Sequence, residues 1–437
     1  MGLPTPVFDP TPFPFRMRFR TASRSPFGFA SRVGCFGAFW GISSIHAATV
    51  VLPTAPSGFS AVPAAPSGFT TAPSAAPADG GAARTFLEGF TLATTMSGTY
   101  DSNVTQSPGG SVAPVQDDFI MSLGGSIGYM SKSSDWTFGG TYRGSYNQYF
   151  SQSDFSGYNQ GGSAVVNYSG GRFNASLSTG IDYDEGSNRN YNSAFVARTS
   201  VNTNFTAGYR LSPKTSLQGN LGQSYSTASG GDFSDTESFN AGISALWKYS
   251  PLTEWGPGLR YTYNTGSSQT GRSSVGPTLT VNYKLSTKVA LNSRVGVDFA
   301  SYEEGGSADP TFSTAIGLNY QASKLWGMNL SLYRDTQADP SVAGSFTEVT
   351  SLRVGYHRKV RRATFNMGVG YDVNSLQSPD GGAGDDRNYF TTDASLGMPV
   401  FLNSSFASIF ARYSDQQSGV TDSWDGVQMG FSISRSF

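Results

Sequence analysis

The chain of 437 residues contains very little cysteine and histidine. Its single cysteine is Cys35, and of its two histidines, His46 and His357, only the second lies far from the N-terminus. A serine hydrolase needs a base, normally histidine, to take the proton of its nucleophile. Disulfides and cysteine- or histidine-based metal sites also need more of these residues. The inventory therefore predicts no catalytic residue, no metal site, no cofactor and no enzyme.

Charged residues are also scarce, at 14% of the chain against roughly 25% in ordinary soluble domains. The net charge of −1 offers nothing to neutralise a run of phosphates, which argues against a nucleic-acid partner. No apolar run reaches the length of about 18 residues that a transmembrane helix requires. What is abundant is Gly (53), Phe (31) and Tyr (22). Such a composition suits a wall with lipid on one side and water on the other.

Residues 1–47 have the layout of a secretory signal peptide. Arginines between Arg16 and Arg32 precede the apolar run Gly34–Ile45, and Ala47 offers a cleavage site. Met17 is an alternative start. Residues 48–85 are dominated by Pro, Ala, Ser and Thr, and APSGF occurs at 55–59 and 65–69. This composition predicts a disordered periplasmic linker. A plug in the lumen and a tether to peptidoglycan are the alternatives.

Residues 86–437 alternate between apolar and small polar side chains. Between Ala363 and Val373 every odd-numbered residue is apolar, and every even-numbered one is Thr, Asn, Gly or Asp. Successive side chains of a β-strand point to opposite faces, so this segment has one apolar and one polar face. Residues 239–249, 275–284 and 326–333 repeat the pattern. Many such segments end in Tyr or Trp at a turn, as in the aromatic girdles of membrane barrels.

The connections between these segments alternate in length. Short turns are expected at 132–135, 169–172, 212–214, 249–253, 286–288, 322–324, 358–362 and 398–403, with longer Gly-, Ser-, Asp- and Asn-rich loops between them. Short periplasmic turns and long external loops characterise up-and-down barrels of the bacterial outer membrane. We therefore predict an all-β fold, an antiparallel transmembrane β-barrel of about 18 strands. Residues 163–168 and 404–413 alternate poorly.

The chain ends in a strand-like segment with apolar residues on one parity. Phe431, Ile433 and the terminal Phe437 resemble the C-terminal signal that outer-membrane proteins present to the barrel assembly machinery. Outer-membrane lipid and lipopolysaccharide are the other expected partners. Acidic loop residues such as Glu303 and Glu304 could bridge lipopolysaccharide through divalent cations or simply aid solubility.

Strand parity also assigns the residues that face the lumen. Most are Gly, Ser, Thr and Asn, which suits a water-filled interior. The charged residues expected to line the pore are Arg143, Arg198, Arg260, Arg294, Arg353, Arg412, Asp182, Asp298, Asp372 and Asp393. Two interpretations stay open: pairing across neighbouring strands that stiffens the wall, and a slightly basic constriction that tunes ion selectivity. The loop lengths give no sign of a loop folded into the lumen.

The first predicted strand closes with Gly98-Thr99-Tyr100-Asp101-Ser102-Asn103-Val104. A Tyr-Asp-x-Asn-Val stretch before a long series of hairpins resembles the putative β-barrel porin 2 families. The resemblance implies an outer-membrane barrel of unsettled substrate, and some members are associated with exopolysaccharide systems. The sequence thus favours a passive porin-like channel for small hydrophilic solutes. The alternative is a structural or partner-binding barrel linked to exopolysaccharide export or surface anchoring.

Overall fold

A computed structural model describes residues 89–107, 114–188, 194–229, 233–266, 271–303, 309–340, 345–377, 383–400, 405–418 and 423–437. All of them belong to the compact unit Ala55–Phe437. The predicted signal peptide (1–47) and the predicted linker (48–85) lie outside the described residues. No helix in the described part of the chain is long and apolar enough to cross a membrane.

The described residues form strands joined into one closed wall. The strands are β1 (Phe90–Asp101), β2 (Asp118–Lys132), β3 (Trp136–Tyr149), β4 (Gly157–Gly170), β5 (Phe173–Asn188), β6 (Ala194–Arg210), β7 (Thr215–Ser229), β8 (Thr236–Lys248), β9 (Thr253–Gly266), β10 (Arg272–Lys284), β11 (Val289–Tyr302), β12 (Thr311–Ser323), β13 (Trp326–Ala338), β14 (Phe346–Val360), β15 (Ala363–Gln377), β16 (Ala383–Val400), β17 (Ser405–Ser418) and β18 (Trp424–Ser436), with one 3-10 turn, η1 (Ser153–Phe155). Each strand pairs antiparallel with the next along the chain.

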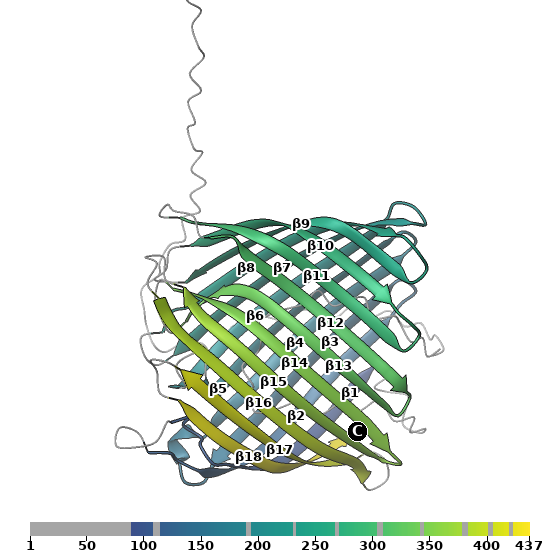
Figure 1. Cartoon of the computed structure of the whole chain (residues 1–437). Helices are drawn as coiled ribbons and strands as arrows, with labels where there is room; N and C mark the ends of the chain where they lie inside the picture. Colours follow the sequence, from purple (N-terminus) through teal and green to yellow (C-terminus); the bar gives the residue numbers. More distant parts are fainter. Residues whose placement is uncertain are drawn as a thin grey trace, which may run out of the picture. The chain divides into compact units, whose positions relative to one another are not determined.

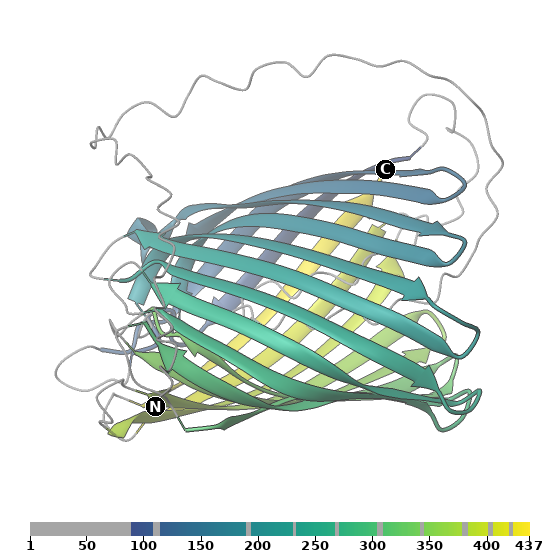
Figure 2. The same ribbon diagram turned by 90° about the horizontal axis from the view of Figure 1, so that it is seen from above.

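The last strand closes the barrel on the first. β18 pairs antiparallel with β1, from Ala93 opposite Ser436 to Asp101 opposite Gln428. Figures 1 and 2 show the resulting wall of tilted strands, with the yellow C-terminal strands behind the teal ones in Figure 2. The 18-stranded sheet confirms the predicted antiparallel barrel of about 18 strands. The poorly alternating residues 163–168 and 404–413 belong to β4 and β17.

The short turns gather at one end of the barrel, where the C-terminus also lies (Figures 1 and 2). Several of them are built around a serine that accepts backbone N–H groups. The Ser212 hydroxyl accepts from Thr215 N at 3.0 Å, and Ser250 accepts from Thr253 N at 3.0 Å. Ser286 does the same for the N–H of residue 289 at 3.2 Å. Such side-chain caps favour tight turns, so the local sequence sets these connections.

At the opposite end the strands are longer than the sequence predicted. β5 continues to Asn188 and β15 to Gln377, through segments expected to be loop. Over this extra length β5 stays in register with β6 and β15 with β14, while the pairing of β15 with β16 shifts register between Ser375 and Gln377. Strand pairing satisfies backbone N–H and C=O groups in water as well as in lipid, so a strand can continue into a polar segment. The alternation of apolar residues therefore underestimates the length of these strands.

The outer face of the wall is apolar and exposed. More than half of the surface of each of Leu123, Ile181, Leu259 and Phe299 is exposed. A soluble protein would bury such side chains in contact with one another. They occupy the strand parity predicted to face lipid. Phe431, Ile433 and Phe437 also lie on this face. An apolar outer surface around a closed barrel is what a lipid bilayer requires of a protein that crosses it with strands.

Aromatic rings form a chain of contacts beside the short turns. Trp136 lies 4.7 Å from Tyr168, centroid to centroid. Trp326 contacts Tyr356 at 6.2 Å, and Tyr356 contacts the ring of residue 365 at 6.3 Å. Trp and Tyr favour the membrane–water interface, where their apolar rings and polar tips are both accommodated. The contacts therefore mark one boundary of the membrane-spanning band.

Candidate functional site in the barrel lumen

The ten charged residues predicted to line the pore all lie on the inner parity of their strands. Arg260 lies between Leu259 and Tyr261, and Asp298 precedes Phe299, all three of these apolar residues being exposed on the outer face. An exposed apolar neighbour also flanks Arg143, Arg294, Arg353, Arg412, Asp182 and Asp372, whereas Arg198 and Asp393 are assigned to the inner face by the alternation of their strands alone. Their part in conduction remains a prediction.

Several of these charges form ion pairs on the inner face. Arg143 Nη2 lies 2.6 Å from Asp182 Oδ1, in a pair whose arginine side chain is 58% exposed. Arg353 Nη2 lies 2.6 Å from Asp372 Oδ2. Asp393 and Arg412 are opposite one another in the register of β16 and β17. Pairing thus accounts for part of the predicted set.

Three enclosed charges form a cluster that we call the central triad: Arg260, Asp298 and Asp335. Arg260 Nη1 lies 3.2 Å from Asp298 Oδ2, and its Nη2 pairs with Asp335 Oδ2. Tyr333 also donates its hydroxyl to Asp335 Oδ2, at 2.8 Å. The triad joins β9, β11 and β13. The sequence did not single out Asp335, because it fell in a segment expected to be an external loop.

A glycine on the intervening strand allows two of these pairs to form. Gly161 lies between Arg143 and Asp182 in the register of β3, β4 and β5. Gly276 lies opposite Arg260 on β10, and a Cβ there would approach Asp298 Oδ1 to 2.6 Å. Any side chain on the middle strand would separate the charges. The pairs Arg143–Asp182 and Arg260–Asp298 therefore span two strand spacings, whereas Arg353 and Asp372 lie on the neighbouring strands β14 and β15.

Replacing Gly276 with valine should destabilise the barrel by roughly 1–3 kcal/mol, the usual cost of overpacking. The added Cβ would collide with the carbonyl oxygen of Val297 as well as with Asp298. Gly186→Val is the matched control, since a Cβ at Gly186 meets no atom within 4 Å. The temperature at which folded protein is lost in semi-native gel electrophoresis measures the effect. Equal stability of the two variants would contradict this account.

Two predicted arginines have no carboxylate within ion-pair distance. In the part of the chain that the structure describes, Arg198 and Arg294 form no ion pair within 4.0 Å, although Asp184 lies opposite Arg198 in the register. The Nε atom of Arg198 is buried without a hydrogen-bond partner. Buried polar groups are almost always satisfied in folded proteins. These two guanidinium groups are therefore positive charges available inside the barrel.

The β13–β14 hairpin leans into the lumen, although the loop lengths gave no sign of a loop folded inward. β13 contacts β8 and β9, which are five and four positions away around the wall. The side-chain amide of Asn264 on β9 donates to the carbonyl oxygen of Thr336 at 3.2 Å. Ser234 N donates to the carbonyl oxygen of Pro340 at 3.0 Å. Because these strands are not neighbours in the sheet, the outer end of β13 must lean inward to reach them.

Apolar and aromatic contacts support the same hairpin. Phe346 at the start of β14 is fully buried, and its ring lies 5.7 Å from that of Tyr302. The guanidinium of Arg272 lies 6.0 Å from the centre of the Phe346 ring. Ala338 is buried as well. A loop in water would leave these groups exposed, so the apolar residues Ala338 and Phe346 at the two ends of this polar loop are the signal in the sequence that could have revealed the hairpin.

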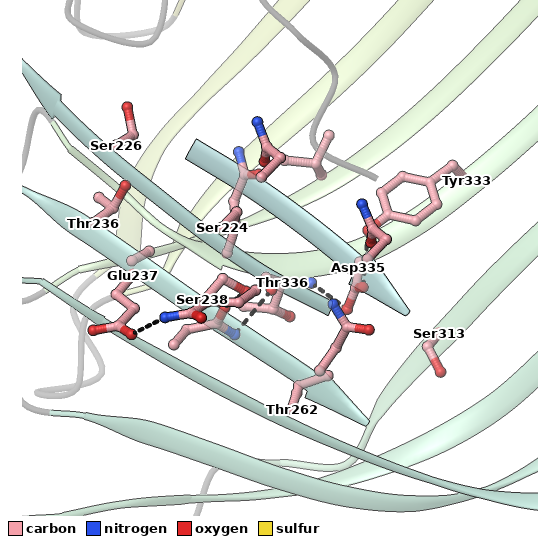
Figure 3. A pocket seen from close by; sticks show the side chains of 18 of the residues that line it. Ser224, Ser226, Thr236, Glu237, Ser238, Thr262, Ser313, Tyr333, Asp335 and Thr336 are labelled. Atoms are coloured by element: carbon pink, nitrogen blue, oxygen red, sulfur yellow. Dashed lines mark hydrogen bonds between the residues drawn. The ribbon is translucent and has the colours of Figure 1, made fainter. Parts of the chain in front are cut away.

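A cavity of about 180 Å³ lies between this hairpin and the wall. Figure 3 shows Tyr333, Asp335 and Thr336 of β13 together with Ser238 of β8 and Thr262 of β9. Arg198, Arg260 and Arg294 also line it. In the described residues, no group of three His, Cys, Asp or Glu side chains could hold a metal ion. His357 lies outside the cavity at the short-turn end, 3.5 Å from the amide of Gln321.

The Tyr-Asp-x-Asn-Val stretch closes the barrel at its long-loop end. We call Asp101, Asn103, Ser107 and Gln428 the closing cluster. Asn103 Nδ2 donates to the carbonyl oxygens of Ser107 at 2.8 Å and Asp425 at 2.9 Å, and its Oδ1 accepts from Ser107 N at 2.9 Å. Asp101 accepts from Asn103 N at 2.9 Å and from Gln428 Nε2 at 2.7 Å. The motif thus joins β1 to β18.

Comparison with known proteins gives a family match over part of the chain. Residues 181–360 match the model of the family described as putative beta-barrel porin 2. No curated protein matches the chain significantly.

Among solved structures, the outer membrane protein OpdK from Pseudomonas aeruginosa is 13% identical, with 81% of this chain and 100% of that chain covered and a TM-score of 0.44. OccAB3 of Acinetobacter baumannii is 11% identical, with 80% and 100% covered and a TM-score of 0.42. The FrpB iron transporter from Neisseria meningitidis is 10% identical, with 80% and 82% covered and a TM-score of 0.42.

The closed wall of strands, its apolar outer face and aromatic boundary, and the family match lead to one conclusion. The chain is a bacterial outer-membrane β-barrel protein that resembles the putative β-barrel porin 2 family over residues 181–360.

Proposed function

We propose that the barrel is a passive channel that lets small hydrophilic solutes cross the outer membrane. The observation that carries this proposal is a closed 18-stranded wall whose inner face bears Ser, Thr, Asn, Arg and Asp side chains. An 8-stranded barrel is filled by its own side chains, whereas barrels of roughly 16–18 strands leave an aqueous interior. Polar side chains at an aqueous lumen favour water and solutes over lipid.

The inward β13–β14 hairpin and the charged residues around it favour a narrow pore, and not a wide one. Arg260 and Asp335 of the central triad and the arginines Arg198 and Arg294 line the same cavity. Charged rings and constrictions set the selectivity of channels. We therefore propose modest conductance with charge-dependent selectivity, and we assign the ten predicted charged residues to the pore lining.

Assembly into the membrane belongs to the same proposal. Phe431, Ile433 and Phe437 lie exposed on the outer face of the closing strand, where the barrel assembly machinery could bind them. Lipid and lipopolysaccharide would then surround the finished barrel.

Single-channel recording in a planar bilayer tests the channel. The full-length mature chain and a variant that lacks residues 49–83 should both give regular current steps, because the conducting path is the barrel itself. Silence of the full-length chain with conduction after the deletion would assign those residues to a plug. Silence of both would contradict the proposal and favour the structural or partner-binding barrel.

A further inference from the structure

The cavity beside the β13–β14 hairpin has the features of a ligand site. Its wall on β6, β7 and β8 is rich in amide side chains that point inward: Asn202, Asn204, Asn220 and Asn240. Hydroxyl groups of Ser224, Ser238 and Thr262 lie among the strands that Figure 3 shows. Each amide both donates and accepts hydrogen bonds, and each hydroxyl can do either. Such a wall fits a ligand with several hydroxyl groups.

The amide wall retains unused hydrogen-bonding capacity. Asn220 Nδ2 reaches Asn240 Oδ1 at 3.4 Å, which is long for a hydrogen bond. A shorter bond from Ser238 Oγ to Asn264 Oδ1, at 2.7 Å, occupies one acceptor near the hairpin. The remaining amide groups of the wall are therefore free to bind hydroxyl groups of a solute.

The charges of the cavity indicate an anionic ligand, because its lining contains four arginines (Arg198, Arg260, Arg294 and Arg334) and two carboxylates (Glu237 and Asp335). Arg260 is neutralised by two carboxylates, Asp298 and Asp335. Arg198 and Arg294 line the same cavity and form no ion pair with a described residue, and Arg198 Nε is buried without a partner. Arg272 is different, because its guanidinium lies over the ring of Phe346 and it does not line the cavity. Two unpaired guanidinium groups at one cavity are suited to bind a carboxylate.

The size of the cavity limits the ligand. A volume of about 180 Å³ holds on the order of a dozen water molecules, at roughly 10–15 Å³ for each. That is about the number of heavy atoms in a monosaccharide.

We propose that this cavity binds a sugar acid, a monosaccharide-sized solute that carries one carboxylate and several hydroxyl groups. Arg198 and Arg294 supply the charge that attracts the carboxylate, and the amide wall of β6–β8 binds the hydroxyls. This site rests on the proposed function, since it names the class of solute that the channel would select. The solute would bind this site weakly, because a conducted solute must be able to dissociate toward either side of the membrane.

Current blockade in a planar bilayer tests the site. Millimolar sodium glucuronate should cause transient blockades of the wild-type channel, and glucose at the same concentration should not. The double variant Arg198→Gln/Arg294→Gln should need at least a tenfold higher glucuronate concentration for the same blockade. Arg172→Gln/Arg362→Gln removes the same charge at the short turns, outside the cavity, and should behave as wild type. Equal blockade by glucose, or equal loss in both double variants, would overturn the proposal.

Calorimetry separates failure of the site from failure of the channel. Glucuronate is titrated into the full chain folded in detergent, where binding is measured even if the barrel does not conduct. Binding by wild type that weakens at least tenfold in a folded Arg198→Gln/Arg294→Gln variant supports the site. Absence of binding by wild type, or unchanged binding by that variant, overturns it. Regular conductance together with absent binding would leave the channel standing without a sugar-acid site.

Discussion

Replacing Arg260 with alanine should lower the stability of the barrel by about 3–5 kcal/mol, the usual cost of removing one partner from a buried charge pair. The substitution leaves Asp298 and Asp335 without their shared cation, and the side chains of the triad are mostly enclosed, Asp298 being 6% exposed. Two carboxylates that face one another without a counter-ion repel each other. Equilibrium unfolding by urea in detergent micelles measures the change.

Arg143→Ala is the matched control for this prediction. It also removes an arginine from an ion pair on the inner face, but that arginine is 58% exposed. Exposed pairs contribute between about 0 and 1 kcal/mol, because water screens them and holding long side chains in place costs entropy. Similar losses in the two variants would show that enclosure of the central triad has no energetic consequence. A double-mutant cycle of Arg260→Ala with Asp335→Ala should give a coupling energy above about 0.5 kcal/mol.

The same substitution should change conduction. Arg260 joins β9 to Asp335 on the inward hairpin, so its loss removes one of the contacts that hold the hairpin against the wall. It also leaves two negative charges at the cavity. We expect larger single-channel conductance and a reversal potential shifted toward cation selectivity. Unchanged conductance in a folded variant would mean that the hairpin does not limit the current.

Asn103→Ala should be the second severe substitution and should lower the free energy of unfolding by about 3 kcal/mol. Asn103 is 3% exposed and makes its bonds to Ser107 and Asp425 with both ends of the amide. Each buried group left unpaired costs roughly 1–3 kcal/mol. The folded fraction after heating, read by semi-native electrophoresis, and urea unfolding both measure this effect.

Asn167→Ala is the comparison for Asn103. Asn167 is half-buried on β4 and accepts one side-chain bond, from Ser176 Oγ at 2.6 Å. Loss of this hydrogen bond should lower the free energy of unfolding by about 1 kcal/mol, the net contribution of a typical hydrogen bond. If Asn103→Ala were no more harmful than Asn167→Ala, the closing cluster would not stabilise the junction of β1 and β18.

The wall of the barrel could be predicted from sequence because it depends on local pattern. Alternation with a period of two residues decides which face of each strand meets lipid, and a slip by one residue would invert every side chain. That is why Phe299 and Tyr371 lie on the outer face while their neighbours Asp298 and Asp372 are buried on the other parity. Serine-capped turns such as the one at Ser250 are local as well.

The site could be predicted only in part, because its contacts are long-range. Parity placed Arg260 inside, but its partner Asp335 lies 75 residues away on a strand that is not a neighbour. The pair Arg143–Asp182 depends on Gly161 of the strand between them, and register is needed to see this. The Tyr-Asp-x-Asn-Val motif was noticed, but its chemistry depends on Asp425 at the other end of the chain.

The pairing of β18 with β1 sets the order in which the fold can be completed. Every other pair of neighbouring strands is a hairpin of consecutive segments, so most of the wall can form from contacts close in sequence. The junction brings together Asn103 and Asp425, which are 322 residues apart. The chain entropy lost on closing a loop grows with its length, and contacts of high sequence separation slow folding. We expect closure of this junction to be the slowest step of folding, so that an unclosed sheet with two free edges precedes the finished barrel.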